Sequence, residues 1–181
     1  MILRGKKVIL RDKRLEDAAR DYEWRTDQEL ARLDATTPLK TRFPDYQEFY
    51  AEELDYPTPR RYKLAVEDLT GKHIGNCMYY DMKNLKGQVE LGIMIGDRAY
   101  WSKSYGTDAV LTLLEYLFNE HEMERVYLHT LDWNKRARRC FEKCGFVACD
   151  TVQRDGHTFI VMEIFREQWK KQPAPALRGA K

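Results

Sequence analysis

The stretch 89–118 constrains the fold more than any other, because it joins a strand pattern to a helix pattern through a short polar turn. Every second residue at its start is apolar, as in a half-buried strand: Val89, Leu91, Ile93 and Ile95. Apolar residues at its end recur at helical spacing: Val110, Leu113, Leu114 and Leu117. The turn between them, 101–107, contains no acidic residue. Unpaired N–H groups at the start of such a helix, together with the helix dipole, predict an anion site, to which Lys103 adds a positive charge.

The remaining patterns predict an α+β protein with a mixed, mostly antiparallel sheet flanked by helices. Strands are expected at 6–12, 62–67, 73–80, 89–95, 125–131, 146–152 and 158–164, and helices at 15–24, 44–56, 104–121 and 134–144. The segment 26–43 is expected to be irregular, and a turn is expected at 84–87. Because the strand at 125–131 follows the long helix, it should lie parallel to the strand at 89–95, which places a parallel pair in the middle of the sheet.

The length and charge of the chain limit what it can do. At 181 residues it is expected to form one domain over residues 1–170, followed by a mobile tail at 171–181. A net charge of +2 gives no reason to expect nucleic acid or an anionic membrane as a partner. No apolar run approaches the length that spans a bilayer, and the start of the chain lacks a signal-peptide core.

The four cysteines do not form a recognisable metal or disulfide pattern. Cys77, Cys140, Cys144 and Cys149 include no C-x-x-C pair, and no histidine stands at a zinc-finger spacing from them. We therefore expect free thiols rather than disulfides or a metal site. Free thiols suit a reducing compartment, so a cytoplasmic location is expected.

Two motifs resemble those of the GNAT acetyltransferase superfamily, most closely its RimJ/RimL-type N-acetyltransferase branch. The turn Trp101-Ser102-Lys103-Ser104-Tyr105-Gly106-Thr107 resembles Q/R-x-x-G-x-G/A, which in this branch commonly reads W-G-K-G-Y-G/A-T. The later segment resembles N-x-x-A-x-x-x-Y-x-K-x-G-F and matches it at Asn134, Ala137, Lys143, Gly145 and Phe146. The chain departs from these patterns with serine for glycine at 102 and 104, and with Phe141 for tyrosine.

The resemblance implies a GNAT-like sheet with a splayed central parallel pair and acetyl-CoA as co-substrate, with no metal. The pyrophosphate would sit on the backbone at 102–107, which a serine at 104 crowds unless its hydroxyl donates. The pantetheine arm would lie along the splayed strand. The implied cofactor-binding residues are Ile93, Met94, Ile95, Trp101, Ser102, Lys103, Ser104, Tyr105, Gly106, Thr107, Asn134, Ala137 and Phe141. The alternative is a helix start that is merely capped by serine, and a plain N-cap is also compatible with Asn134.

Acetyl transfer to an amine needs a group that removes a proton, because an alkylammonium titrates near pKa 10.4. Glu90 is our catalytic candidate, since it lies on the strand that would carry the cofactor; the alternative is an ordinary strand glutamate. His129 on the neighbouring strand ranks second, and Tyr127 and Asp132 are weaker candidates. In many relatives the tyrosine hydroxyl that Phe141 lacks protonates the CoA thiolate, so this chain could react more slowly, use Tyr105 or water, or be non-catalytic.

The acceptor is expected to be a small-molecule or peptide amine: a protein N-terminus, a polyamine or another small amine. Its pocket should include Trp24, Arg25, Asp34 and Tyr50, with either Tyr79 or Tyr80 facing inward. A non-catalytic module that only binds CoA or acyl-CoA is the alternative function. A homodimer is expected at the level of the family.

Overall fold

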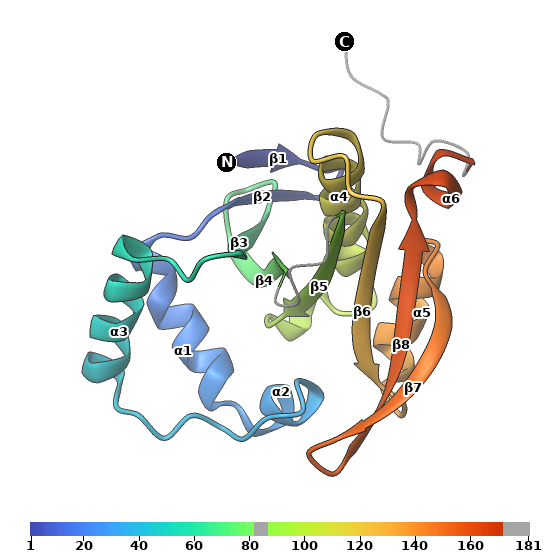
Figure 1. Cartoon of the computed structure of the whole chain (residues 1–181). Helices are drawn as coiled ribbons and strands as arrows, with labels where there is room; N and C mark the ends of the chain where they lie inside the picture. The colour runs from blue at the N-terminus through green and yellow to red at the C-terminus, as the bar shows by residue number, and fades with distance from the viewer. Residues whose placement is uncertain (82–86, 172–181) are drawn as a thin grey trace.

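The computed structural model describes residues 1–81 and 87–171 and shows one eight-stranded sheet in the order β1-β2-β3-β4-β5-β6-β8-β7 (Figure 1). The strands are β1 (Ile2–Arg4), β2 (Val8–Asp12), β3 (Arg61–Asp68), β4 (His73–Tyr80), β5 (Gln88–Ile95), β6 (Arg125–Leu131), β7 (Val147–Arg154) and β8 (His157–Phe165). Only β5 and β6 pair in parallel; the other neighbours among these strands are antiparallel. The predicted mixed, mostly antiparallel sheet with a central parallel pair is confirmed.

The helices lie on both faces of this sheet. They are α1 (Ala18–Thr26), α2 (Gln28–Leu33), α3 (Phe43–Asp55), α4 (Tyr105–Asn119), α5 (Lys135–Lys143) and α6 (Arg166–Lys171), with 3₁₀ turns η1 (Leu15–Asp17) and η2 (Arg98–Tyr100). Leu113, Leu114, Leu117 and Phe118 of α4 are fully buried in the main core, which continues onto the inner face of β2 to β6. The first three helices group together away from α4, where they bound the opposite face (Figure 1).

Several short elements differ from the sequence prediction. The segment 26–43 is not wholly irregular, because α2 forms there with Asp27 accepting a hydrogen bond from the Leu30 N–H. The three-residue strand β1 and helix α6 were also not predicted, and α4 ends at Asn119 rather than at 121. Lys171, the first residue of the predicted tail, is the last residue of α6. The rest of the tail, and the turn at 84–87 apart from Gly87, lie outside the described residues. In the described ranges, no helix is both long and apolar enough to cross a membrane.

Trp24 of α1 packs against the backbone where β5 ends. A Cβ added at Gly96 would fall 2.1–2.6 Å from atoms of the Trp24 ring. The ring is almost completely buried and meets His73 of β4 edge-on, with centroids 4.9 Å apart. The contact therefore fixes α1 beside the point where the chain leaves the sheet for the polar turn at 101–107.

We expect Gly96→Ala to destabilise the fold by about 1–3 kcal/mol, because the added methyl overpacks a site that Trp24 already fills. Urea unfolding measures this as a lower midpoint with an unchanged slope. Gly106→Ala is the matched control, since its Cβ would meet Ile95 and Cys140 at ordinary contact distances of 3.6 and 3.7 Å. Equal midpoints for the two variants would show that Trp24 does not constrain this turn.

Candidate active site

Helix α4 begins with unpaired backbone donors next to two serines in the left-handed conformation. Ser102 and Ser104 have φ values of 58° and 68°, which for a residue other than glycine costs on the order of 1–3 kcal/mol. Among the described residues, the amides of 105–107 make no hydrogen bond, and the first helical bond runs from the Asp108 N–H to the Ser104 carbonyl. The serines thus take the backbone shape for which glycine is usual, and the helix start is left open to an anion.

Asp108, the acid nearest to these donors, is directed toward another part of the chain. Its carboxylate accepts hydrogen bonds from the backbone N–H groups of Lys6, Lys7 and Val8 at 3.2, 2.7 and 3.1 Å. It is buried and ties the β1–β2 turn to α4. Its charge is therefore balanced by backbone donors rather than held at the open amides.

Strands β5 and β6 separate along their length. Their ladder joins only 88–90 to 125–127, whereas β5 stays paired with β4 as far as Ile95. Beyond Glu90, the edge of β5 that faces β6 has no strand partner in the described part of the chain. The Ile95 carbonyl is already paired, because it accepts a 2.6 Å hydrogen bond from the Trp101 indole N–H. The splayed edge offers the backbone groups that an extended ligand would pair with.

A cavity of about 440 Å³ runs from this splayed edge to the start of α4. Most of the predicted cofactor residues line it: Ile93, Met94, Ile95, Trp101, Ser102, Ser104, Gly106, Thr107, Asn134, Ala137 and Phe141. Lys103 and Tyr105 do not line it. The Tyr105 ring instead packs edge-on against Tyr100, with the Lys7 ammonium over its face. Asn134 caps α5, its side-chain oxygen accepting the Ala137 N–H at 3.2 Å.

Three basic side chains that line the same cavity are not among the predicted cofactor residues: Arg136, Arg139 and Lys143, of which only Lys143 belongs to the second motif. All three lie on α5, whose sequence Lys-Arg-Ala-Arg-Arg-Cys-Phe-Glu-Lys was a visible signal for an anion. The Arg136 guanidinium stacks on the Trp101 ring at 3.5 Å, and burial lowers the pKa of Arg136. The cavity thus combines open amides with cations, a donor set that suits phosphate groups.

Glu90 and His129 meet in a second, larger cavity of about 1,100 Å³ on the side of α1 to α3. The His129 Nδ1 lies 2.6 Å from Glu90 Oε1, and both side chains are about one-seventh exposed. Burial alone would raise the pKa of the Glu90 carboxyl, but hydrogen bonds from His129 and Tyr80 hold it below its ordinary value. No hydrogen bond to His129 Nε2 is present among the described residues. A neutral ring that donates from Nδ1 to the carboxylate presents this nitrogen as an acceptor.

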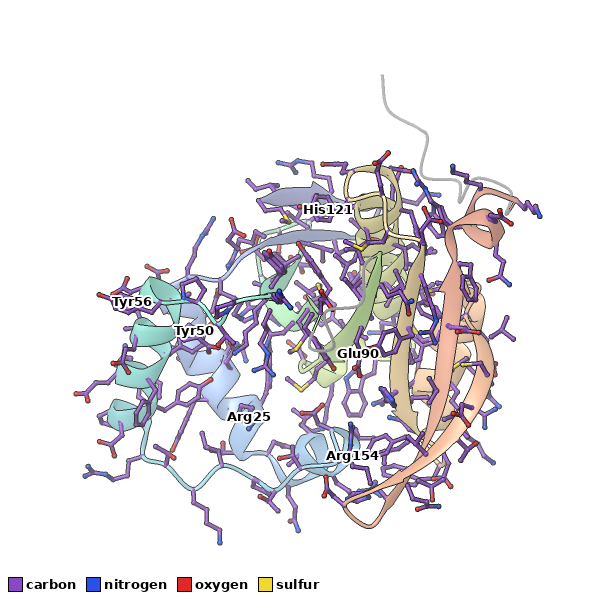
Figure 2. The ribbon with its side chains drawn as sticks, in the orientation of Figure 1. Arg25, Tyr50, Tyr56, Glu90, His121 and Arg154 are labelled. Atoms are coloured by element: carbon purple, nitrogen blue, oxygen red, sulfur yellow. The ribbon has the colours of Figure 1, made fainter. Side chains whose placement is uncertain are left out.

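Other residues predicted for the acceptor pocket are divided between this cavity and the core. Arg25, Asp34, Tyr50 and Tyr80 line the cavity, whereas Trp24 and Tyr79 do not. Tyr127 and Asp132 are also outside its lining. Figure 2 shows Glu90 on β5 near the middle of the molecule, with Arg25 and Tyr50 on the side of α1 and α3.

The two cavities share the wall formed by β5 and α5. Ile93, Met94, Asn134, Ala137 and Phe141 line both of them. Phe141 is mostly buried and packs edge-on against Phe146. A ligand in the first cavity and a ligand in the second would therefore meet beside β5 at Ile93 and Met94, three and four residues along the strand from Glu90.

The chain is similar to known proteins over nearly its whole length. The family model described as "Acetyltransferase (GNAT) domain" matches residues 7–147. An aminoglycoside N(6′)-acetyltransferase type 1 of Klebsiella pneumoniae is 24% identical over 177 residues, which cover 91% of this chain and 86% of that protein. A spermidine N(1)-acetyltransferase of Vibrio cholerae is 26% identical over 123 residues, covering 68% and 65%.

Solved structures show the same fold. An aminoglycoside acetyltransferase in complex with coenzyme A aligns with a TM-score of 0.75 at 23% identity, covering 91% of this chain and 98% of that one. The spermidine N-acetyltransferase from Vibrio cholerae in complex with CoA and spermine aligns with a TM-score of 0.79 at 18% identity, covering 92% and 100%. At these identities the likeness establishes the fold alone.

Proposed function

Because the chain belongs to the acetyltransferase (GNAT) family and is an acetyl-CoA-dependent N-acetyltransferase, we propose that its two cavities hold the two substrates. The smaller cavity would take acetyl-CoA and the larger one the amine. The observation that supports this most directly is their shared wall beside Glu90. There the amine nitrogen would bond to the acetyl carbon as the carbon–sulfur bond breaks.

The residues of the smaller cavity suit acetyl-CoA. The open amides of 105–107 would bind the pyrophosphate, and Arg136, Arg139 and Lys143 would balance its phosphate charges. The unpaired edge of β5 would hold the pantetheine arm as an added strand. The same edge would supply backbone N–H groups to the thioester oxygen, which gains negative charge as the amine attacks.

Glu90 and His129 would act together to remove the amine proton. The Glu90 carboxylate, 2.6 Å from Nδ1, would fix the ring of His129, which lines the cavity, and Nε2 would receive the proton. Phe141 supplies no proton for the departing thiolate, and Tyr105 lies outside the cavity lining. A thiol that titrates near 8.5 is a tolerable leaving group without such help, and water could protonate it.

The acceptor that we propose is a primary amine on a small molecule or peptide. The similar proteins named above act on aminoglycosides and spermidine, which are amines of different shapes. The RimJ/RimL-type branch, the homodimer and the single acetyltransferase domain over 1–170 stay predictions. We place the reaction in the cytoplasm because all four cysteines are free thiols, as expected for a reducing compartment.

Substituting Gly106 tests the pyrophosphate site. We expect Gly106→Asp to weaken CoA binding roughly 100-fold, because the new carboxylate would face the phosphates at the open amides. The fold should survive, since an acid is favourable in the first turn of a helix. Calorimetric titration with CoA gives the dissociation constant.

Gly106→Ala separates charge from bulk at the same position. Its Cβ has ordinary contacts with Ile95 and Cys140, so its CoA affinity should stay within about threefold of the wild type. If the aspartate and alanine variants bind CoA equally well, the phosphates do not lie at the start of α4.

A further inference from the structure

Four of the six carboxylates that line the larger cavity are paired with a positive charge of the protein itself. The six belong to Asp12, Asp21, Asp34, Glu53, Glu90 and Asp155. Within the described ranges, each except Asp155 has an ammonium, a guanidinium or a histidine ring within 4.0 Å. Asp155 lies on the exposed β7–β8 turn. Among the described residues of the lining, only Glu90, which contacts the His129 ring, and Asp155 lack an ammonium or guanidinium within 4.0 Å, so little negative charge is left to attract a polycationic acceptor.

Two arginines that line the same cavity have no carboxylate within salt-bridge distance in the described ranges. In the part of the chain that the structure describes, Arg61 and Arg154 make no side-chain hydrogen bond and no ion pair. The Nε of Arg61 is buried without a hydrogen-bond partner, which is costly unless something binds there. Arg25, Lys13 and Lys63, the other arginine and lysines of this lining, are each paired with a carboxylate.

Both free guanidinium groups lie near the proposed proton acceptor. Arg61 is the β3 partner of Tyr80 on β4, and Tyr80 is in turn the partner of Glu90 on β5, so the three form one row across the sheet. The Arg61 guanidinium lies over the Tyr80 ring at 5.9 Å. Arg154 belongs to the β7–β8 hairpin (Figure 2). It lines the cavity, and its guanidinium lies over the Phe159 ring at 4.9 Å. Against the effect of burial, the positive charge of Arg154 adds to the hydrogen bonds that hold the pKa of Glu90 below its ordinary value.

We infer that the acceptor is a primary amine that also carries an anionic group, a carboxylate or a phosphate, bound by Arg61 and Arg154. This rests on the proposed function, since it places the amine of the same molecule at the Glu90–His129 pair. Guanidinium groups form paired hydrogen bonds to both kinds of anion, and their aromatic platforms hold them in place. Zwitterionic acceptors such as amino acids or phosphorylated amines fit this arrangement, whereas a second ammonium group of a polyamine would be repelled by the two guanidinium groups.

The test compares acceptors that differ only in the charge of the distal group. Thiol release from acetyl-CoA is measured with ω-amino carboxylates from glycine to 6-aminohexanoate and with 2-aminoethyl phosphate, each against the diamine of the same length. We expect kcat/KM to favour the best anionic acceptor over its diamine at least tenfold. Arg61→Met and Arg154→Met should each lower that ratio about tenfold or more, mainly through KM. Arg42→Met is the control, because Arg42 is a highly exposed arginine outside the cavity.

The result that would overturn the inference is a diamine used as well as its anionic partner at every length, or a ratio unchanged in both variants. Carboxylate and phosphate arms show which anion the site takes. If no amine leads to thiol release, the proposed function fails rather than this inference. The inference is then tested by calorimetric binding of the same amines to the CoA-loaded protein. Binding that Arg61→Met and Arg154→Met weaken supports the site, and no binding rejects it.

Discussion

Replacing Glu90 with glutamine should lower kcat/KM for the acceptor amine about 10²- to 10³-fold while the dissociation constant of CoA stays unchanged. The substitution keeps the shape of the side chain but removes the charge that fixes the His129 ring, 2.6 Å away. General acid–base catalysis contributes roughly 10²- to 10⁴-fold to enzymatic rates, so the loss of the pair should be large. Steady-state thiol release and CoA calorimetry on the same preparation measure both quantities.

His129→Gln separates two ways in which the pair could work. If the proton passes to His129 Nε2, both variants should lose activity to a similar extent, because the residues act as one unit. If Glu90 accepts the proton directly, His129→Gln should lose only about tenfold. Activity within threefold of the wild type in both variants would remove this pair from the reaction.

The strongest sequence patterns determined most of the fold. The strands predicted at 73–80 and 125–131 coincide with β4 and β6, and most residues of both strands are buried. The elements that were missed are short. Strand β1 has only three residues and depends on its pairing with β2, and α2 has only six residues. Both are too short for a hydrophobic periodicity to be recognised in the sequence. Their existence is decided by tertiary contacts.

The sequence predicted the parts of the candidate site that depend on the order of strands and helices. It did not predict the parts that depend on which charged side chains lack a partner in the folded protein. The turn before α4 was located by its motif, but the sequence could not tell that Ser102 and Ser104 adopt positive φ values. Glu90 and His129 were placed on neighbouring strands, and their contact follows from the short parallel ladder at 88–90. Arg61 and Arg154 were not found, because their significance lies in having no ion-pair partner among the described residues, and only packing reveals this.

The acceptor cavity is held in shape by a buried ion-pair network between α1 and the sheet. Asp17, at the end of η1, accepts two hydrogen bonds from the Arg11 guanidinium at 2.8 Å each and one from the Arg14 N–H at 2.8 Å. Lys13, which lines the cavity, lies 2.7 Å from Asp21 in the same network. Burial would raise the pKa of Asp17, but these donors lower it to about 2. The position of α1 beside the sheet therefore depends on Asp17 being ionised.

We expect Asp17→Asn to lower the free energy of unfolding by about 3 kcal/mol at neutral pH, because removing one partner leaves buried positive charge unbalanced. Since the folded pKa of Asp17 lies below its unfolded value, its contribution is present above about pH 4 and is lost as the pH falls toward 2. The difference between wild type and variant, measured by urea unfolding, should therefore shrink over that interval. Glu23→Gln breaks an exposed pair with Arg20 and should cost less than about 1 kcal/mol at any pH. A difference for Asp17→Asn as small as this control, or equal at pH 7 and pH 2, would show that the network does not hold α1 through charge.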